Sequence, residues 1–271
     1  MKLLCKVMGV SRSRYYKYLR KLTVKKGQCD RLLVEVRTLS KESDNSYGSR
    51  RISKALKQRG YTVGRYAART LMQAAGINCK QRRRYRLLTT QSKHSFAVAD
   101  NLLNRAFTAA APNRVWLTDI SYLRTLEGFL YIAAVLDVFS RRIVGWAIAD
   151  HMREALVQEA LQMALGRRQP GKGLMHHSDR GVQYAADHYQ SLLKSAGIIV
   201  SMSRKGNCWD NAVMERFWGS LKSERTDEKT YLTREYAKAD VIDYIEMFYN
   251  CKRLHSSLDY VSPMQFENDF S

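Results

Sequence analysis

Long apolar runs and secretion signals are missing from this sequence. No stretch reaches the roughly 18 consecutive apolar residues that a membrane-spanning helix requires. The N-terminal segment MKLLCKVMGVSRSRYYKYLRK lacks the continuous apolar region and the cleavage site of a signal peptide, because Arg12, Arg14 and Lys17 interrupt it. We therefore expect a protein that stays in the cytoplasm and has no membrane partner.

Paired cysteines are also missing. Cys5, Cys29, Cys79, Cys208 and Cys251 are dispersed, with no C-x-x-C pair among them. This pattern predicts reduced thiols and excludes the usual kind of zinc site. His176 and His177 are adjacent, so in a strand they point to opposite faces and cannot chelate one ion together. We interpret them as ordinary histidines at the end of a strand.

Acidic residues are scarce in the first third of the chain. Residues 1–90 contain 24 Lys and Arg against 4 Asp and Glu, whereas residues 91–271 contain 22 against 21. Nearly all of the formal net charge of +21 therefore lies before residue 91. A surface that only has to be soluble can mix positive and negative side chains and needs no such excess of positive charge. We therefore expect this part to bind a polyanion, with nucleic acid as the default partner.

The apolar spacing of the basic part predicts helices. A short helix and a turn at GVS precede a second helix, and Asp30 is a plausible cap for a further helix with apolar residues at helical spacing. Residues 46–77 contain two more helices around a Gly-bearing turn, which is typical of a helix-turn-helix, although helical bundles with other roles share this pattern. Its second helix would present Arg65, Tyr66 and Arg69 to DNA.

We divide the chain into a helical DNA-binding region (1–80), a basic linker (81–108) and a catalytic core (109–271). The linker contains Arg82, Arg83 and Arg84, which would lie along a phosphate backbone or belong to an exposed hinge without contacts. After Pro112 the pattern changes to three β-rich runs, VWLTDISYLRT, FLYIAAVLDVFS and RRIVGWAIAD. Helices then alternate with LMHHSD and IIVSMS, and a helical extension ends the chain. This order predicts a mixed five-stranded α/β sheet of the ribonuclease-H-like type.

Three carboxylates stand in settings that suit metal ligands. Asp119 lies inside the first strand, Asp179 ends the fourth, and Glu215 lies in NCWDNAVMERFWGSLKSE, whose pattern predicts a capped amphipathic helix. The first and fourth strands would be neighbours in this sheet, with the helix above them. Hard cations such as Mg²⁺ prefer carboxylate oxygens, and a pair of them can activate both oxygens of a phosphodiester exchange.

Each carboxylate also has an ordinary interpretation, as a turn residue, an Arg180 partner or an exposed helix glutamate. Taken together, the three favour a metal site. Asp137 is interpreted as structural, paired with Arg141 or Arg142. Lys222 lies seven residues after Glu215 on the same helix face and would contact substrate phosphate, or else be a solvated lysine.

The segments WLTDISYL, LDVFSRRIVGWA, HSDRGVQY and SRKGNCWDNAVMERFWGSLKSE together resemble the integrase-core transposases of bacterial insertion sequences. With GVSRSRYYKYL, YGSRRISKAL and YNCKRLHSSLDYVSPMQFE, nearly the whole chain is similar to the second-frame (OrfB-type) subunit of the IS-three family. Small departures from the family pattern, at Ser121, Val182 and Arg216, remove no candidate ligand.

The resemblance implies that Asp119, Asp179 and Glu215 are a catalytic triad that binds Mg²⁺, for which Mn²⁺ can substitute. It implies cleavage at terminal inverted repeats and joining of the 3′ ends to target DNA. It also implies a homo-oligomer on DNA and a first-frame (OrfA-type) partner or fusion. Two alternatives stay open: a catalytically silent DNA-binding regulator of the element, and a simple ribonuclease-H-like nuclease.

Overall fold

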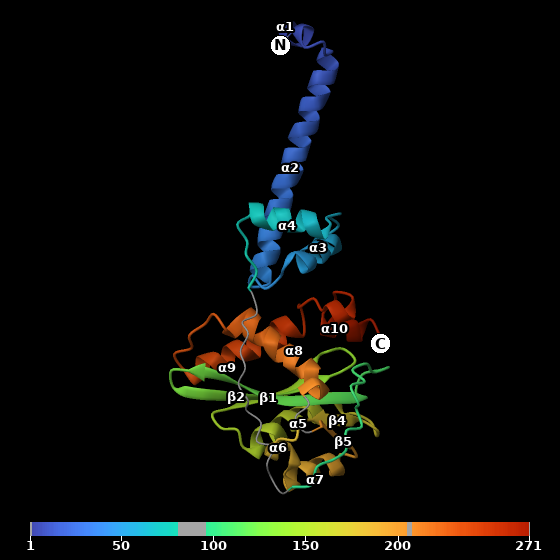
Figure 1. Cartoon of the computed structure of the whole chain (residues 1–271), viewed down its shortest axis with the longest axis vertical. Helices are drawn as coiled ribbons and strands as arrows, with labels where there is room; N and C mark the ends of the chain where they lie inside the picture. The colour runs from blue at the N-terminus through green and yellow to red at the C-terminus, as the bar shows by residue number, and fades with distance from the viewer. Residues whose placement is uncertain (1, 81–95, 205–207, 271) are drawn as a thin grey trace. The chain divides into compact units, whose positions relative to one another are not determined.

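The computed structural model describes residues 2–80, 96–204 and 208–270 and divides the chain into two compact units, Met1–Lys80 and Gln81–Ser271 (Figure 1). Most of the predicted basic linker, with Arg82, Arg83 and Arg84, falls in residues 81–95, outside the described residues. Residues 96–108 contain bends and turns but neither helix nor strand. No helix among the described residues is long and apolar enough to cross a membrane.

The first unit is helical. Its elements are α1 (Lys2–Val7), α2 (Arg12–Glu42), α3 (Ser49–Gln58) and α4 (Arg65–Ala74). Ser11 begins α2, and its hydroxyl accepts a hydrogen bond from the Arg14 amide, which satisfies one of the free amides of the first turn. The C-terminal half of α2 packs against α3 and α4 through a small apolar core, formed by Val36, Leu39, Ile52, Leu56, Ala68 and Met72. The helix-turn-helix expected at residues 46–77 is α3 and α4.

One expectation for this unit is wrong. Asp30 does not begin a new helix, because α2 runs without a break over 31 residues. The only strong helix breaker in this stretch is Gly27, which costs about 1 kcal/mol relative to alanine. Adding a residue to an existing helix needs no new nucleation, so a single glycine does not end it.

The second unit is built on the predicted five-stranded sheet. Its strands are β1 (Val115–Thr125), β2 (Gly128–Asp137), β3 (Ile143–Ala149), β4 (Met175–Ser178) and β5 (Ile199–Met202), in the order β3-β2-β1-β4-β5. β1, β2 and β3 pair antiparallel, whereas β4 pairs parallel with both β1 and β5. The predicted mixed sheet is confirmed, and β1 and β4 are neighbours.

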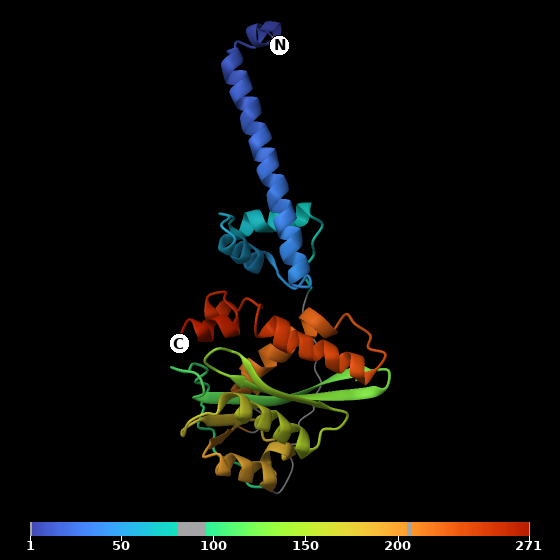
Figure 2. The same ribbon diagram turned by 180° about the vertical axis from the view of Figure 1, so that it is seen from behind.

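Helices cover both faces of the sheet. On one face lie α5 (Glu154–Arg168), α6 (Val182–Ala185) and α7 (Asp187–Ser195), packed on Trp116, Ala133 and Val135. On the other lie α8 (Ala212–Leu221) and α9 (Arg234–Asp243), packed on Leu117, Ile132 and Ala134. Figure 2 shows the same two layers from behind. The alternation of side chains along β1 and β2 thus supplies two separate cores.

The C-terminal part of the chain contains two π-helical segments, η2 and η3, and three short helices, η1, η4 and α10. The 3₁₀ turn η1 (Cys208–Asn211) precedes α8, and η2 (Lys222–Thr226) follows it. η3 (Tyr244–Tyr249) continues α9, and η4 (Ser256–Leu258) and α10 (Pro263–Asn268) complete the chain. Asn250 ties this extension to the sheet, because its side chain accepts from the Ile143 amide and donates to the Ile143 carbonyl, both at 2.9 Å.

Gly145 sets how closely α5 approaches β3. A Cβ at this position would lie 2.2 Å from the Ala160 carbonyl oxygen and 2.7 Å from the Ala164 amide nitrogen. We expect Gly145→Ala to destabilise the protein by about 2–3 kcal/mol, because backbone atoms must move apart. Urea unfolding measures this effect. Gly166→Ala in α5 is the matched control, since its Cβ would meet nothing within 4 Å, and it should be neutral or stabilising. Equal unfolding midpoints for the two variants would contradict the close packing.

Candidate active site

The register of β1 and β4 places Asp119 beside Asp179. Leu117 of β1 is opposite His177 of β4 in a parallel pair. Two residues further along each strand are Asp119 and Asp179. Neighbouring strands are about 4.8 Å apart, so Asp119, in the middle of β1, and Asp179, directly after β4, lie side by side where β4 ends.

Asp119 is under the electrostatic influence of the other two carboxylates. It is partly exposed, on the face of β1 that α8 covers. Burial, the nearby charge of Asp179 and the weaker influence of Glu215 raise its pKa from 3.8 to about 8. The indole nitrogen of Trp218 donates to Asp119 Oδ2 at 3.1 Å, which opposes this rise. An arrangement of this kind favours a bound cation, which relieves the repulsion between the carboxylates.

Asp179 is fixed by the turn that follows β4. Its Oδ1 accepts from the Gly181 amide at 2.8 Å, and the Arg180 guanidinium donates to the Ser203 carbonyl at 2.6 Å. His177 is buried under this turn, with its ring nitrogens 2.8 and 3.1 Å from the Ser201 and Ser203 hydroxyls. Both adjacent histidines are buried, and Tyr189 contacts His176 at 2.9 Å, so they are structural as expected.

Glu215 is exposed in the first turn of α8, and Trp218 follows it by three residues on the same face. The Trp218–Asp119 hydrogen bond therefore holds this face of α8 over β1. Phe217 and Leu221 of α8 are buried in the core on this side of the sheet, and Val213 packs against the same core.

The predicted side-chain cap of this helix is wrong. Asn211 precedes α8 but makes no capping hydrogen bond. Its Nδ2 instead donates to the Thr118 carbonyl at 3.3 Å, next to Asp119. Asn211 is a positioning residue that the sequence did not reveal, because an asparagine before a helix ordinarily indicates a cap.

Asp210 is a second positioning residue that the sequence did not reveal. Its side chain is buried and accepts hydrogen bonds from Asn101 at 2.7 Å, from the Arg204 amide at 3.0 Å and from the Arg105 side chain at 3.1 Å. Burial acts to raise its pKa, but the Arg204 and Arg105 hydrogen bonds prevail and lower the pKa to about 2. These hydrogen bonds join the segment before β1 to η1, the turn that precedes α8.

Lys222 lies one step beyond the end of α8, in η2. Its ammonium group is 5.2 Å from the centre of the Tyr122 ring, on β1 three residues after Asp119. The cation is therefore held beside the same strand that carries Asp119. Tyr122 and Asp119 are an odd number of residues apart in β1, so this contact does not by itself place Lys222 over the carboxylates.

The donor set suits a hard divalent cation, since all three candidates are carboxylates. No group of three His, Cys, Asp or Glu side chains among residues 2–80, 96–204 and 208–270 is already close enough to hold a metal ion. Asp119 and Asp179 are brought together, whereas Glu215 acts on Asp119 more weakly.

Asp137 is structural, as expected, but its partners differ from those predicted. Its carboxylate accepts from the amides of Asn113 and Phe139 at 2.7 and 2.9 Å and lies 3.4 Å from the Arg168 guanidinium. Arg142 instead pairs with Glu267 at 2.7 Å. The strand end turns back on itself, so distant arginines are nearer than the adjacent ones.

The candidate DNA-contact residues of α4 are accessible. Arg65, Tyr66 and Arg69 are all exposed in its first two turns, and Tyr66 is 80% exposed.

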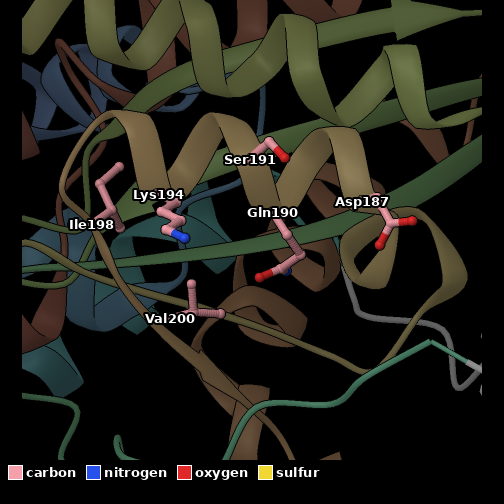
Figure 3. Close-up of a pocket in the computed structure, with 6 residues that line it drawn as sticks. All are labelled: Asp187, Gln190, Ser191, Lys194, Ile198 and Val200. Carbon is pink, nitrogen blue, oxygen red and sulfur yellow. The ribbon is translucent and has the colours of Figure 1, made fainter.

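The surface pocket in Figure 3 is not the site of these carboxylates. It lies between α7 and β5 and is lined by Asp187, Gln190, Ser191, Lys194, Ile198 and Val200. None of the three candidate ligands contributes to it. The acidic site is instead where β4 ends beside β1.

Comparisons with known proteins match nearly the whole chain. Models of an integrase core domain match residues 109–208 and 215–270, and a model of an HTH-like domain matches residues 28–85. The chain is 42% identical to an uncharacterized 31 kDa protein of insertion element IS600 from Shigella sonnei, over 98% of both chains. It is 37% identical to the transposase InsF of insertion sequence IS3A from Escherichia coli, over 99% of this chain and 94% of the relative.

Among solved structures, the fold is similar to a chain of a simian T-cell lymphotropic virus intasome complex. The TM-score is 0.50 at 15% identity, and the match covers 79% of this chain and 70% of that one. The likeness concerns the fold, and it agrees with the sheet order and the helix layers described above.

Proposed function

The chain belongs to the IS-three family of insertion-sequence transposases, and we propose that it is a DNA transposase whose Asp119, Asp179 and Glu215 form the polynucleotidyl transferase site. The β1–β4 register carries this proposal, because it sets Asp119 and Asp179 side by side. The hydrogen bond from Trp218 then brings the Glu215 helix over them. A simple nuclease would need the same site, but the transposase relatives favour joining as well as cleavage.

The three carboxylates would hold divalent metal ions, of which Mg²⁺ is the proposed one and Mn²⁺ a substitute. Bound there, such ions stabilise the attacking and the leaving oxygen of an in-line phosphodiester exchange. Asp119 and Asp179 would hold them from the sheet, and Glu215 would complete the set from α8. Lys222, kept beside β1 by Tyr122, would orient a substrate phosphate.

The proposed substrate DNA is the element's terminal inverted repeats together with a target duplex, in the bacterial cytoplasm. The helical unit would select the repeats, and the core would join the freed 3′-hydroxyl to the target. We propose that the active form is a homo-oligomer on DNA, with a first-frame product as partner or fusion. The basic segment with Arg82, Arg83 and Arg84 would contact DNA phosphates.

A strand-transfer assay with the element's own ends tests this function. Purified protein should nick and join terminal-repeat DNA in Mg²⁺, and a chelator should abolish both steps. The assay is run with and without the upstream-frame product, which separates a need for the partner from a lack of catalysis. Protein that binds the ends but never joins them under either condition would support the silent-regulator alternative instead.

We expect the double substitution Arg65→Ala/Arg69→Ala to weaken binding of terminal-repeat DNA. Each arginine that neutralises a phosphate contributes about 0.9 to the slope of log K against log salt concentration, so the slope should fall by about 2. Binding titrations of the full chain at several salt concentrations measure it. Lys172→Ala/Lys194→Ala, which removes two exposed lysines of the other unit, is the charge-matched control. An unchanged slope for the α4 variant would exclude these arginines as phosphate contacts.

A further inference from the structure

The N-terminal arm of this chain, defined here as α1 and the first two turns of α2 (residues 2–19), has no role in the site or in the helix-turn-helix. The HTH-like match begins only at residue 28. α3 and α4 pack on the C-terminal half of α2, around Val36 and Leu39. Within the first unit, α1 is the only element beside the opposite end of α2 (Figures 1 and 2).

Basic and acidic residues are distributed unevenly along the first unit: its beginning has only basic residues, and the acidic ones follow. Residues 1–29 contain nine Lys and Arg and no Asp or Glu. The four acidic residues of the unit all follow, and three of them are paired there: Glu35 and Glu42 with Arg59, at 2.8 and 2.5 Å, and Asp44 with Lys80 at 3.0 Å. The arm itself, residues 2–19, contains five of these Lys and Arg and no acidic residue, whereas the base of the unit is partly neutralised.

The arm presents these cations to solvent. Arg12, Arg14 and Lys17 are exposed, and in the described part of the chain no ion pair with an acidic side chain is recorded for any of them. The neighbouring Tyr16 and Tyr18 side chains are also exposed, by 44% and 60% respectively. Arginine, lysine and tyrosine side chains are the groups that contact DNA phosphates. A second copy of the same arm is a poor occupant, because five like charges would face five others.

We propose that this arm is a second DNA-contact site that binds the same terminal-repeat duplex as α4, about one helical turn away. Arg14 and Val36 are 22 residues apart in α2, which is about 33 Å at 1.5 Å per residue. One turn of B-DNA is about 34–36 Å. α2 crosses α4 steeply (Figure 1). With α4 in a major groove, α2 runs more nearly along the duplex, which brings the arm to the next groove on the same side.

The inference rests on the proposed function, in that α4 must read terminal-repeat DNA. Hydroxyl-radical footprinting of the full chain on this DNA tests it. We expect two protected blocks with centres about 10 base pairs apart. Arg12→Gln/Arg14→Gln/Lys17→Gln should lose one block, bind about tenfold or more weakly, and lower the salt slope by about 2 to 3. Glutamine is a good helix former, so α2 should persist, which circular dichroism checks.

Arg31→Gln/Arg37→Gln/Lys41→Gln is the matched control, since it removes three exposed cations from the other half of the same helix. It should keep both blocks. Inserting five base pairs between the two protected blocks moves the second block to the opposite side of the DNA, since this is about half a helical turn. This insertion should weaken the wild-type protein to the level of the arm variant and leave the arm variant itself unchanged.

The possible outcomes distinguish a failure of this inference from a failure of the proposed function. One block in the wild type, or two in the arm variant, overturns the inference and leaves the proposed function standing. One block together with stronger self-association of the arm variant identifies a second copy as the occupant, which also overturns it. No protection at all in the wild type overturns the proposed recognition of the repeats as well.

Discussion

Asp119→Asn should abolish strand transfer, lowering its rate by at least on the order of a thousandfold, which is about 4 kcal/mol in the activation free energy. The substitution keeps the shape of the side chain and its place beside Asp179, but it removes the charge that would hold a cation. DNA binding should stay within about twofold, because that step is assigned to the other unit. Joining assays and binding titrations on the same preparation measure both quantities.

The stability of the metal-free protein tests the effect of Asp119→Asn independently of strand transfer. The folded-state pKa of Asp119 is raised, chiefly by burial, from 3.8 to about 8. An acid whose pKa is raised on folding causes stability to fall as pH rises from the unfolded to the folded value. Between about pH 4 and pH 8 the wild type should therefore lose stability that Asp119→Asn retains. Added Mg²⁺ should raise the Tm of the wild type and have less effect on the variant.

Glu159→Gln is the control for both readings, because Glu159 is an exposed carboxylate on α5, away from the site. It should join strands at the wild-type rate and respond to Mg²⁺ as the wild type does. Normal joining by Asp119→Asn, or an equal Mg²⁺ response of all three proteins, is incompatible with the assigned carboxylate site.

Arg253→Leu should destabilise the protein by about 3–5 kcal/mol, because it leaves a carboxylate buried without its cation. Arg253 and Glu224 have side chains only 6% and 8% exposed, and they meet twice, at 2.6 and 2.7 Å. The Tyr244 hydroxyl donates to the same carboxylate at 2.8 Å. This cluster joins η2, which directly follows α8, to η3 and the C-terminal segment. Its loss should therefore loosen the helix that carries Glu215.

Urea unfolding measures the effect, and two further variants identify its cause. Arg167→Leu breaks the more exposed pair with Glu246, whose side chains are 43% and 30% exposed, and should cost less than about 1 kcal/mol. Arg253→Leu/Glu224→Leu removes both buried charges and should recover part of the lost stability. A double variant no more stable than Arg253→Leu alone would show that packing, rather than the stranded charge, causes the loss.

Much of the catalytic unit was predictable from local pattern. β1 was expected as VWLTDISYLRT and is Val115–Thr125, because the segment is rich in the β-branched and aromatic residues that are enriched in strands. The same reasoning correctly gave the neighbouring positions of β1 and β4. It failed for α2, where a plausible cap at Asp30 was outweighed by continuation of an existing helix. It failed again at Asn211, because this side chain bonds to the Thr118 carbonyl and does not cap α8.

The C-terminal signature shows a different limit. YNCKRLHSSLDYVSPMQFE contributed to the resemblance, but nothing in its pattern indicates what these residues contact. Asn250 bonds to both backbone groups of Ile143, Arg253 to Glu224, and Glu267 to Arg142 and Arg168. Each partner is far away in the sequence, so no local spacing could identify it.

The sequence by itself determined the sheet, the basic charge of the helical unit and the identity of the three candidate carboxylates. These depend on local periodicity, on composition and on residue type. Only the tertiary structure decided how the carboxylates are held. Trp218 donates to Asp119, Asn211 to the Thr118 carbonyl, and Arg253 fixes the segment after α8. Hydrogen bonds between distant segments depend on three-dimensional register and orientation, which are set only when the helices pack on the sheet.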